Sequence, residues 1–456
     1  MPLPPELIQS LEHISGFNRD NFIKVHESGE QVVSVRRNPS KNFDTPGSLF
    51  AAPLSPVPWS TNGFYLNQRP SFTADPLFHA GAYYVQEASS MFLEQALQQT
   101  VDVSRPLKVL DLCAAPGGKS TLLQSLLNEQ TVLISNEVIK TRVTILSENI
   151  TKWGAANVIV TNNDPKDFQR LENYFDVIVV DAPCSGSGLF RKDAGAITEW
   201  SENNVALCSQ RQQRILADVF PALKEDGVLI YSTCSYSKEE DEEICDWIME
   251  ELKVESCKLT MDSSWGIVET LSAKKGAWGY RFYPDQLKGE GFFIAAVKKT
   301  NSCGLQAGPV KNKPALLSPA ATAAVKPFLK NAPGFFFIQQ HEAIIALPLH
   351  LQEVLPVLQS ALYIKKAGVT MGTVIRDELI PAHELALSTV ISTTVPSIAV
   401  DRETALQYLR RQDIKPATVL KGWALLTYAG LPLGWVKILP NRINNYYPAA
   451  WRIVNK

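Results

Sequence analysis

Between residues 107 and 299, short runs of β-branched and other apolar residues alternate with longer segments of helical pattern. Mostly apolar strands of this kind are typical of a sheet that is buried on both faces. Their alternation with helices predicts an α/β fold with a mostly parallel sheet. The expected strands are Lys108–Cys113, Thr131–Glu137, Asn157–Asp164, Phe175–Pro183, Gly227–Cys234 and Phe292–Lys299, and the clearest helices are Ile139–Trp153 and Cys208–Lys224.

The composition and periodicity of the sequence change on both sides of this block. Residues 1–70 combine helical and strand-like pieces and form an N-terminal extension. Residues 301–327 are rich in Ala, Pro, Lys and Ser with little periodicity, which predicts a linker. Beyond it we expect an intermediate α/β region over residues 328–400 and a small β-rich module over residues 401–456. The intermediate region shows strand-like Gly334–Gln339 and Ala343–Leu347 and a helix near Leu349–Leu362.

The net charge of −2 is unevenly distributed along the chain. Residues 101–300 carry 22 Lys and Arg against 29 Asp and Glu, a balance of −7, whereas residues 401–456 carry nine against three, a balance of +6. A basic module beside an acidic block suits a polyanionic partner such as RNA. The basic module also holds aromatic residues that could stack on bases, although most are expected to be core: Trp423, Tyr428, Trp435, Tyr446, Tyr447 and Trp451.

The seven cysteines show no Cys-x-x-Cys pair and no spacing typical of a zinc site, so we expect free thiols and no metal. The first residues do not resemble a signal peptide, and no apolar run approaches the roughly 20 residues that cross a bilayer. We therefore expect a soluble, cytoplasmic protein without membrane contact.

A small, glycine-bearing turn follows the first strand, at Asp111-Leu-Cys-Ala-Ala-Pro-Gly-Gly-Lys119, and leads into a helix. Such a turn lets a ligand approach the backbone closely. A Walker loop requires glycine where Cys113 stands, and the Gly-x-Gly-x-x-Gly dinucleotide motif is absent. Glu137 closes the second strand, where it could accept hydrogen bonds from ribose hydroxyls, and Asp164 closes the third, where it could receive an adenine amine. Together they predict an adenosine-containing cofactor without a pyrophosphate.

Ser237 and Glu240 have the spacing of a capping box and predict a helix near Glu239–Lys253. The acidic run Glu239–Glu243 would then form the first helical turn and complement the helix dipole.

Two cysteines stand where strands end, at Asp181-Ala-Pro-Cys184 and Ser232-Thr-Cys234. Because consecutive strands of such a sheet are neighbours, both thiols should meet at the cofactor edge. A thiolate that adds to carbon 6 of a flipped-out cytosine makes carbon 5 able to accept a methyl group, and an acid such as Asp181 could assist at ring nitrogen 3. One thiol suffices for addition and a second can help release the product. The chemistry alone leaves open which cysteine is which.

These motifs resemble those of the Sun/Nop family of RNA cytosine-5 methyltransferases, in particular its RsmF-type members that act on small-subunit ribosomal RNA. The resemblance covers residues 55–299 strongly and the end of the chain moderately. It is carried by Val57-Pro-Trp-Ser, His79-Ala-Gly-Ala-Tyr-Tyr-Val-Gln-Glu-Ala-Ser-Ser, Leu110-Asp-Leu-Cys-Ala-Ala-Pro-Gly-Gly-Lys-Ser, Asp181-Ala-Pro-Cys-Ser-Gly-Ser-Gly, Arg191-Lys-Asp, Ser232-Thr-Cys-Ser and Gly289-Glu-Gly-Phe-Phe.

The resemblance implies a Rossmann-like, S-adenosylmethionine-dependent catalytic domain over residues 71–300. It implies that Cys234 is the nucleophile and that Cys184 assists enzyme release. A Pro-Cys pair also carries the nucleophile of DNA cytosine methyltransferases, and it is the Thr-Cys pair that selects the RNA arrangement. The cofactor pocket is expected to be lined by Cys113, Ala114, Ala115, Pro116, Gly117, Gly118, Lys119, Glu137, Arg142, Asp164 and Asp181.

The resemblance further implies a PUA-like RNA-binding domain at residues 401–456, an RNA-binding role for residues 1–70, and a monomer that acts on 16S ribosomal RNA or the small subunit. Two positions depart from the family pattern: Ala194-Gly195 replaces a proline, which predicts a more flexible loop, and Asp285 stands where histidine is common. Transfer RNA as substrate, a DNA methyltransferase, and a non-catalytic RNA-binding ribosome-assembly factor are the rival hypotheses.

Overall fold

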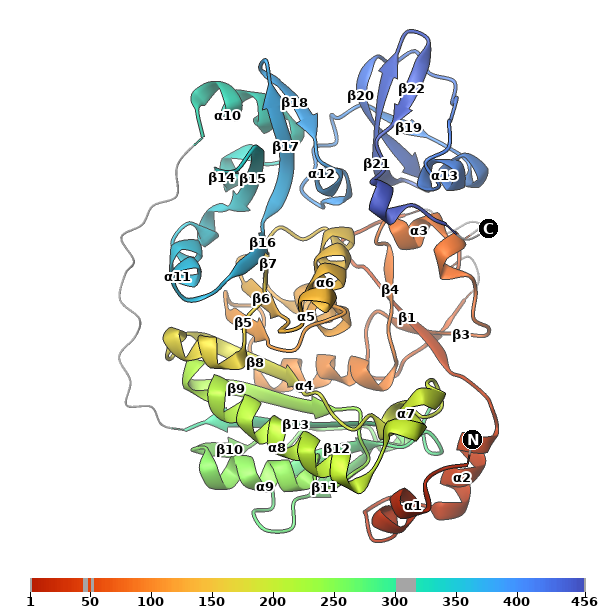
Figure 1. Ribbon diagram of the computed structural model, residues 1–456, viewed down its shortest axis with the longest axis vertical. Helices are drawn as coiled ribbons and strands as arrows, with labels where there is room; N and C mark the ends of the chain where they lie inside the picture. The colour runs from red at the N-terminus through yellow and green to blue at the C-terminus, as the bar shows by residue number, and fades with distance from the viewer. Residues whose placement is uncertain (1, 44–47, 51–52, 301–316, 455–456) are drawn as a thin grey trace.

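The computed structural model describes residues 2–43, 48–50, 53–300 and 317–454 (Figure 1). Its largest element is a 10-stranded sheet in which β9, β8, β5, β6 and β7 are parallel to one another, as predicted. Antiparallel strands extend both sides, and β10 (Val254–Ser256) pairs beside β13. The main order is β11 (Val268–Leu271), β12 (Trp278–Phe282), β13 (Phe292–Lys299), β9 (Leu223–Thr233), β8 (Phe175–Asp181), β5 (Lys108–Asp111), β6 (Val132–Asn136), β7 (Val158–Thr161) and β16 (Ile364–Ala367).

Two apolar cores lie on the two faces of this sheet, because successive strand residues point to opposite sides. Val109 belongs to one core and Leu110 to the other, and Val177 and Ile178 divide in the same way. One face is covered by α4 (Leu93–Thr100), α5 (Gly118–Leu126) and α6 (Lys140–Trp153). The other is covered by α8 (Glu202–Val219), α9 (Glu242–Glu251) and α11 (Val354–Ala361).

The N-terminal module joins two helices to a small sheet. The helices are α1 (Pro5–Leu11) and α2 (Arg19–Glu27), and the sheet has the order β2 (Ser55–Pro56), β3 (Gly63–Leu66), β1 (Val33–Arg37), β4 (Tyr83–Val85). Because β4 pairs with β1, this sheet extends beyond the boundary expected at residue 70. Buried Arg36 on β1 donates hydrogen bonds to Gly118 O (3.2 Å) and Thr121 Oγ1 (2.6 Å), which ties the module to α5.

The intermediate region has its own sheet, β14 (Phe335–Gln340), β15 (Ala343–Pro348), β17 (Val369–Ile375) and β18 (Glu378–Pro381), with α12 (His383–Leu387) beside it. The two predicted strands and the predicted helix are present, the helix as α11. A further helix, α10 (Pro319–Val325), stands within the expected linker, whose residues 301–316 lie outside the described residues. The region is not separate from the catalytic block, because its strand β16 pairs with β7 (Figure 1).

The C-terminal module is a four-stranded sheet with one helix, α13 (Arg402–Leu409). Trp435 and Tyr447 are buried in it, so these aromatics are core, as expected, whereas Tyr446 is 41% exposed. The module shares an apolar core with α3 (Pro76–His79) and β1 of the N-terminal module. Among the described residues, no helix combines the length and apolar character that membrane crossing needs. The strands are β19 (Ser397–Ala399), β20 (Gly422–Tyr428), β21 (Leu431–Leu439) and β22 (Arg442–Asn445).

The acidic run beside α9 is mostly internal, which makes the predicted capping box wrong. The helix begins at Glu242, and the hydroxyl of Ser237 caps nothing among the described residues. Asp241 and Glu242 instead turn inward to buried Arg281 on β12, whose guanidinium contacts both carboxylates and donates to Tyr236 O (2.8 Å). Burial alone would raise the pKa of Glu242, but the charge of Arg281 lowers it overall. The run was misread because the partner lies far away in sequence.

Arg281→Met should therefore lower the free energy of unfolding by about 3–5 kcal/mol, because it leaves two buried carboxylates without a cation. Urea denaturation followed by circular dichroism measures the loss. Lys238→Met is the matched control: it breaks the half-exposed ion pair with Glu243 (3.2 Å) beside the same helix and should cost less than about 1 kcal/mol. Equal losses for the two variants would contradict a buried network.

Candidate functional site

Cys184 and Cys234 lie in contact at the carboxyl ends of two neighbouring parallel strands. In the β8–β9 pair, Asp181 is in register with Ser232. Each strand then runs on by a few residues, which brings Cys184 Sγ within 3.0 Å of Cys234 Sγ. Both thiols are half-buried, and all the described cysteines are free thiols, while Cys303 lies outside the described residues. The sequence prediction that the two strand-end thiols meet is confirmed.

The loop after Cys184 is locked onto the backbone of Cys234. Gly188 N donates to Cys234 O (2.9 Å), and Tyr236 N donates to Ser187 Oγ (2.9 Å). A Cβ atom at position 188 would stand 2.8 Å from Cys234 O, so only glycine allows this approach. The helix that follows, α7 (Ala194–Glu199), is capped by Asp193, which accepts from Gly195 N (2.8 Å), so the loop predicted to be more flexible is partly helical.

Glu240 stabilises both thiol loops, a role that was not predicted from the sequence, where it was assigned to a helix cap. Its fully buried carboxylate accepts hydrogen bonds from Ser185 N (2.8 Å), Ser185 Oγ (2.5 Å) and Ser235 Oγ (2.7 Å). Gln212 on α8 donates both to Glu240 (3.1 Å) and to Pro183 O (3.1 Å). Burial raises the pKa of Glu240 in spite of these four donors. No local signal distinguishes this glutamate from its acidic neighbours, since all its side-chain partners except Ser235 come from distant segments.

Charges of opposite sign flank the two thiols. The pKa of Cys184 is raised by its hydrogen bond to Cys234, by burial, and by the negative charges of Cys234 and Glu240. On the other side, Lys119 Nζ lies 2.8 Å from Asp181 Oδ2. Burial lowers the pKa of Lys119, but the charges of Asp181 and Cys234 outweigh burial and raise it overall. The lysine is thus a stable cation close enough to interact with the sulfur of Cys234.

The glycine-bearing turn runs from β5 into α5 and is fixed from behind. Gly117 has φ of 115°, a left-handed value that favours glycine, and Ala114 N donates to Asn136 O (2.8 Å). Arg142 donates to Ala115 O (2.6 Å), and Asn149 donates to Pro116 O (2.8 Å). Burial raises the pKa of the Cys113 thiol, which makes it an unreactive part of the turn.

The acids predicted at the strand ends all stand at this edge. Glu137 is almost fully buried, accepts from Ile139 N (2.9 Å) and pairs with Arg142 (3.4 Å). Asp164 caps the turn that follows β7 by accepting from Lys166 N (3.1 Å). Asp111, at the end of β5, stands at the same edge but was not among the predicted site residues. It accepts from Ser120 Oγ (2.6 Å) through one oxygen, while its other buried oxygen has no partner among the described residues. Burial, with the charges of Asp181 and Glu137, raises the pKa of Asp111 to about 7.

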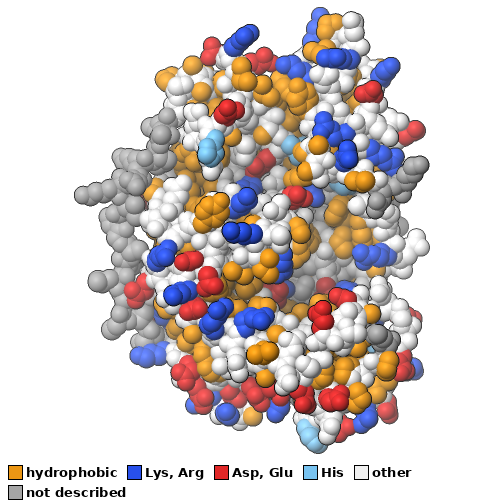
Figure 2. Space-filling view, viewed as in Figure 1, with side chains coloured by type: hydrophobic (Ala, Val, Ile, Leu, Met, Phe, Trp, Pro, Cys, Tyr) orange, Lys and Arg blue, Asp and Glu red, His pale blue; other side chains and the backbone are white. Residues whose placement is uncertain are grey.

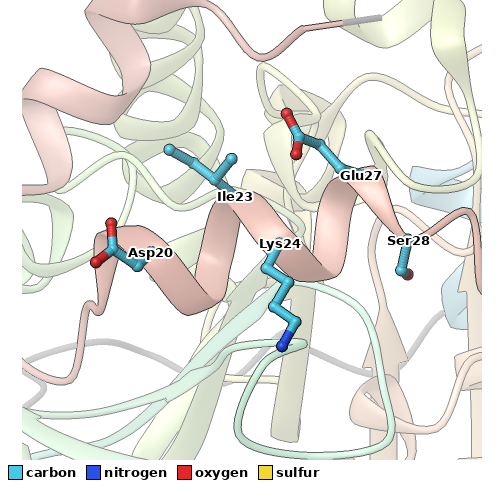
Figure 3. Close-up of a pocket in the computed structure, with 5 residues that line it drawn as sticks. All are labelled: Asp20, Ile23, Lys24, Glu27 and Ser28. Carbon is cyan, nitrogen blue, oxygen red and sulfur yellow. The ribbon is translucent and has the colours of Figure 1, made fainter.

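A shallow hollow of about 430 Å³ lies elsewhere, along α2 (Figure 3). Its lining residues come from α2 and its C-cap in the N-terminal module, and the charged ones are of both signs. They are Asp20, Ile23, Lys24, Glu27 and Ser28. It contains no thiol and none of the strand-end acids, so it is not the site described above.

Three family models match consecutive parts of the chain. The model described as 16S rRNA methyltransferase RsmB/F matches residues 99–298. The N-terminal domain of 16S rRNA methyltransferase RsmF matches residues 3–88, and the methyltransferase RsmF PUA domain matches residues 395–453.

Similar proteins cover most of the chain. The ribosomal RNA small subunit methyltransferase F of Aeromonas salmonicida is 32% identical over 86% of this chain and 84% of its own. Its namesake in Pectobacterium atrosepticum is 30% identical over 98% of this chain and 95% of its own.

Solved structures agree in fold. A methyltransferase homolog protein from Pyrococcus horikoshii is 28% identical, with a TM-score of 0.51 over 65% of this chain and 100% of that chain. NSun6 from Pyrococcus horikoshii with SFG is 20% identical, with a TM-score of 0.53 over 66% of this chain and 99% of that chain, which shows the fold alone. The S-adenosylmethionine-dependent methyltransferase fold is thereby confirmed. The matched N-terminal, catalytic and PUA segments, together with relatives that share most of their length with it, show that this chain belongs to the RsmF-type family of 16S rRNA methyltransferases.

Proposed function

We propose that this protein transfers a methyl group from S-adenosylmethionine to carbon 5 of a cytosine in 16S ribosomal RNA, with Cys234 as the nucleophile. The observation that carries the proposal is the pair of thiols 3.0 Å apart, at the sheet edge that also holds the Lys119–Asp181 ion pair. Two adjacent thiols, one beside a cation and one beside a buried carboxylate, suit a reaction in which a sulfur is added and then expelled.

The residues of the turn fit the proposed cofactor. Asp111 keeps one buried carboxylate oxygen without a partner among the described residues, and a buried orphan acceptor next to a glycine turn calls for a donor from a ligand. Glu137 stands one strand further along, where it can accept from ribose hydroxyls. S-adenosylmethionine supplies the methyl group when bound. The protein's own contribution is to orient it through Asp111, Gly117 and Glu137.

The surroundings of the thiols favour Cys234 as the nucleophile. The ammonium of Lys119 lies on the side of Cys234, whereas the hydrogen bond to Cys234, burial and the charge of Glu240 raise the pKa of Cys184 and disfavour a thiolate there. In the proposed reaction, Cys234 Sγ bonds to carbon 6 and the electron pair of the ring's 5,6 double bond moves to carbon 5, which takes the methyl group. Loss of the carbon-5 proton to a base and cleavage of the bond between carbon 6 and sulfur then restore the double bond and the thiolate. Cys184 assists this release.

In this proposal Asp181 acts on the cytosine ring rather than on the sulfur of Cys234. Its Oδ2 accepts from Lys119 Nζ (2.8 Å) and its Oδ1 accepts from Ser232 Oγ (2.8 Å), so the carboxylate is fixed at the edge. From there the Lys119–Asp181 pair can lend a hydrogen-bonded proton to ring nitrogen 3, which makes carbon 6 more electrophilic.

The distribution of charge supports RNA as the substrate. In Figure 2, acidic side chains gather along the lower part of the molecule, while Lys and Arg side chains lie across its middle and over the C-terminal module. Phosphate contacts by such residues supply sequence-independent affinity. Bisulfite mapping of cellular RNA with and without the protein tests 16S RNA against transfer RNA. RNA binding without methylation under any condition would support the assembly-factor alternative, and competition by DNA would support a DNA methyltransferase.

Replacing each thiol separates the two roles. Cys234→Ser should abolish methylation and adduct formation, because no sulfur remains to attack carbon 6. Cys184→Ser should retain attack but slow release, so a covalent protein–RNA complex should accumulate. Denaturing gel electrophoresis with labelled RNA measures both. An adduct formed by the position-234 variant and not by the position-184 variant would reverse the assignment.

Glu240→Gln tests the control of Cys184. Removal of one buried negative charge should shift alkylation of Cys184 by iodoacetamide to lower pH by about one unit, because the thiolate is no longer repelled. Mass spectrometry of the separate peptides measures the pH profile. Glu239→Gln is the control: it removes the same charge one residue away and should leave the profile in place. An unchanged pH profile of Cys184 alkylation in Glu240→Gln would show that Glu240 does not affect the ionisation of Cys184.

Asp111→Asn tests the cofactor fit through pH. Because the folded pKa of about 7 exceeds the value of about 3.9 of an ordinary aspartate, the folded protein holds a proton that the unfolded chain loses above pH 4. Ionised Asp111 thus costs stability progressively between about pH 4 and pH 7, and fully above that.

At pH 8 Asp111→Asn should raise Tm by roughly 2–4 °C, and the gain should shrink toward pH 4. Its affinity for S-adenosylmethionine should fall roughly tenfold or more, because a charged acceptor is lost. Calorimetry measures both effects, with exposed Asp413→Asn as the control. A variant that is less stable at pH 8, or that binds the cofactor as the parent does, would contradict this assignment.

A further inference from the structure

An exposed aromatic ring stands at the carboxyl edge of the catalytic sheet, and it comes from the intermediate region. β16 runs antiparallel to β7 with Ile364 opposite Thr161, the last residue of β7. Tyr363, immediately before β16, therefore lies beside the end of β7, at the edge that holds the cofactor turn. Its side chain is 63% exposed, which is unusual for a large aromatic residue with a fixed backbone.

The backbone of Tyr363 is fixed by the strand ends themselves. Its carbonyl oxygen accepts from Asn162 N (3.1 Å) and Asn163 Nδ2 (3.1 Å), and its N–H donates to Asn163 Oδ1 (2.8 Å). Asn162 in turn donates to Glu137 O (2.6 Å) and Val138 O (3.0 Å) at the end of β6. Because the backbone of Tyr363 is already fixed, stacking of a ligand on its ring requires no ordering of the backbone.

Three exposed lysines follow the same strand ends: Lys140 after β6, Lys166 after β7 and Lys365 in β16. None of them forms an ion pair within the described part of the chain. The nearby acids have other partners: Glu137 pairs with Arg142, Asp167 pairs with Arg170, and Asp164 accepts from the backbone N–H of Lys166 (3.1 Å). An exposed ring among unpaired cations is suited to an unpaired base and its phosphates.

We propose that this rim patch, formed by Tyr363, Lys140, Lys166 and Lys365, binds a single-stranded RNA segment flanking the target cytosine, with one base stacked on Tyr363. The inference rests on the proposed function. β9, which leads to Cys234, and β16 are five strand positions apart, or about 24 Å at about 4.8 Å per strand. A few nucleotides can span that distance, so a base near the target can reach Tyr363 while the cytosine is at Cys234.

The test compares binding of a short single-stranded oligoribonucleotide with one central cytosine. Tyr363→Ala should weaken binding about 5- to 50-fold, in line with the loss of one base–aromatic stack, whereas Tyr363→Phe should bind as the parent does. Leu349→Ala removes another exposed apolar side chain of the same region and should have no effect. Lys140→Gln and Lys365→Gln should each reduce the slope of log affinity against log salt by about one, while Lys274→Gln, at a distant hairpin, should not.

Affinity for S-adenosylmethionine, measured by calorimetry, should remain unchanged in all these variants. Unchanged RNA binding by Tyr363→Ala would overturn the inference. A loss of cofactor affinity equal to the loss of RNA affinity would also overturn it, since the ring would then cover the cofactor. These measurements need no turnover: a protein that binds RNA through the patch but does not methylate it would refute the proposed function and leave the patch standing.

Discussion

The hydrogen-bonded register between β8 and β9 is the constraint on which the site depends. Two parallel neighbours share a direction, so residues beyond their ends must emerge side by side at about one strand spacing. The pairing of Asp181 with Ser232 fixes the register of the two strands. Each loop then needs only a few further residues to bring the two sulfurs to 3.0 Å. The sheet core sets the distance between the ends of β8 and β9, so the two thiols meet without a long flexible loop. Gly188, which has no side chain, allows the loop after Cys184 to approach the carbonyl oxygen of Cys234 closely.

Acidic side chains are buried beside the thiol loops. Glu240, Asp241 and Glu242 are consecutive, yet each has its own partners: the first holds the thiol loops, and the others meet Arg281. The carboxylate of Glu240 is satisfied only by neutral donors and lies in a medium that screens charge weakly, so its ionised form raises the pKa of Cys184. Lys119, which pairs with Asp181, places a positive charge at the same edge. The two chemically identical thiols therefore have different surroundings.

The sequence allowed the catalytic sheet to be predicted because its strands are continuous apolar runs, which only a doubly covered parallel sheet accommodates. Cys184 and Cys234 could be placed together for the same reason. The partners of Glu240 could not be predicted, since its Ser and Gln donors come mainly from segments that only the fold brings near. Ser237 and Glu240 satisfied a local capping pattern that tertiary burial overrode. The joining of β16 to β7 also escaped prediction, because β16 is a short strand between polar and glycine residues with no periodicity of its own.

The modules outside the catalytic block contact both halves of the sheet. The helices α1 and α2 of the N-terminal module share an apolar core with Phe190 and Tyr236, which follow the two thiols in the chain. The other contacts lie on the cofactor half. Arg36 reaches from the N-terminal sheet to the backbone of α5, directly behind the glycine turn. The intermediate region adds β16 next to β7 and contacts the strand ends through Asn162 and Asn163. The C-terminal module in turn packs against the N-terminal one. Contacts made by these modules can therefore reach the cofactor turn through packed strands and buried hydrogen bonds. Those of the N-terminal helices can also reach the thiol loops, because Phe22 packs against Tyr236, two residues after Cys234.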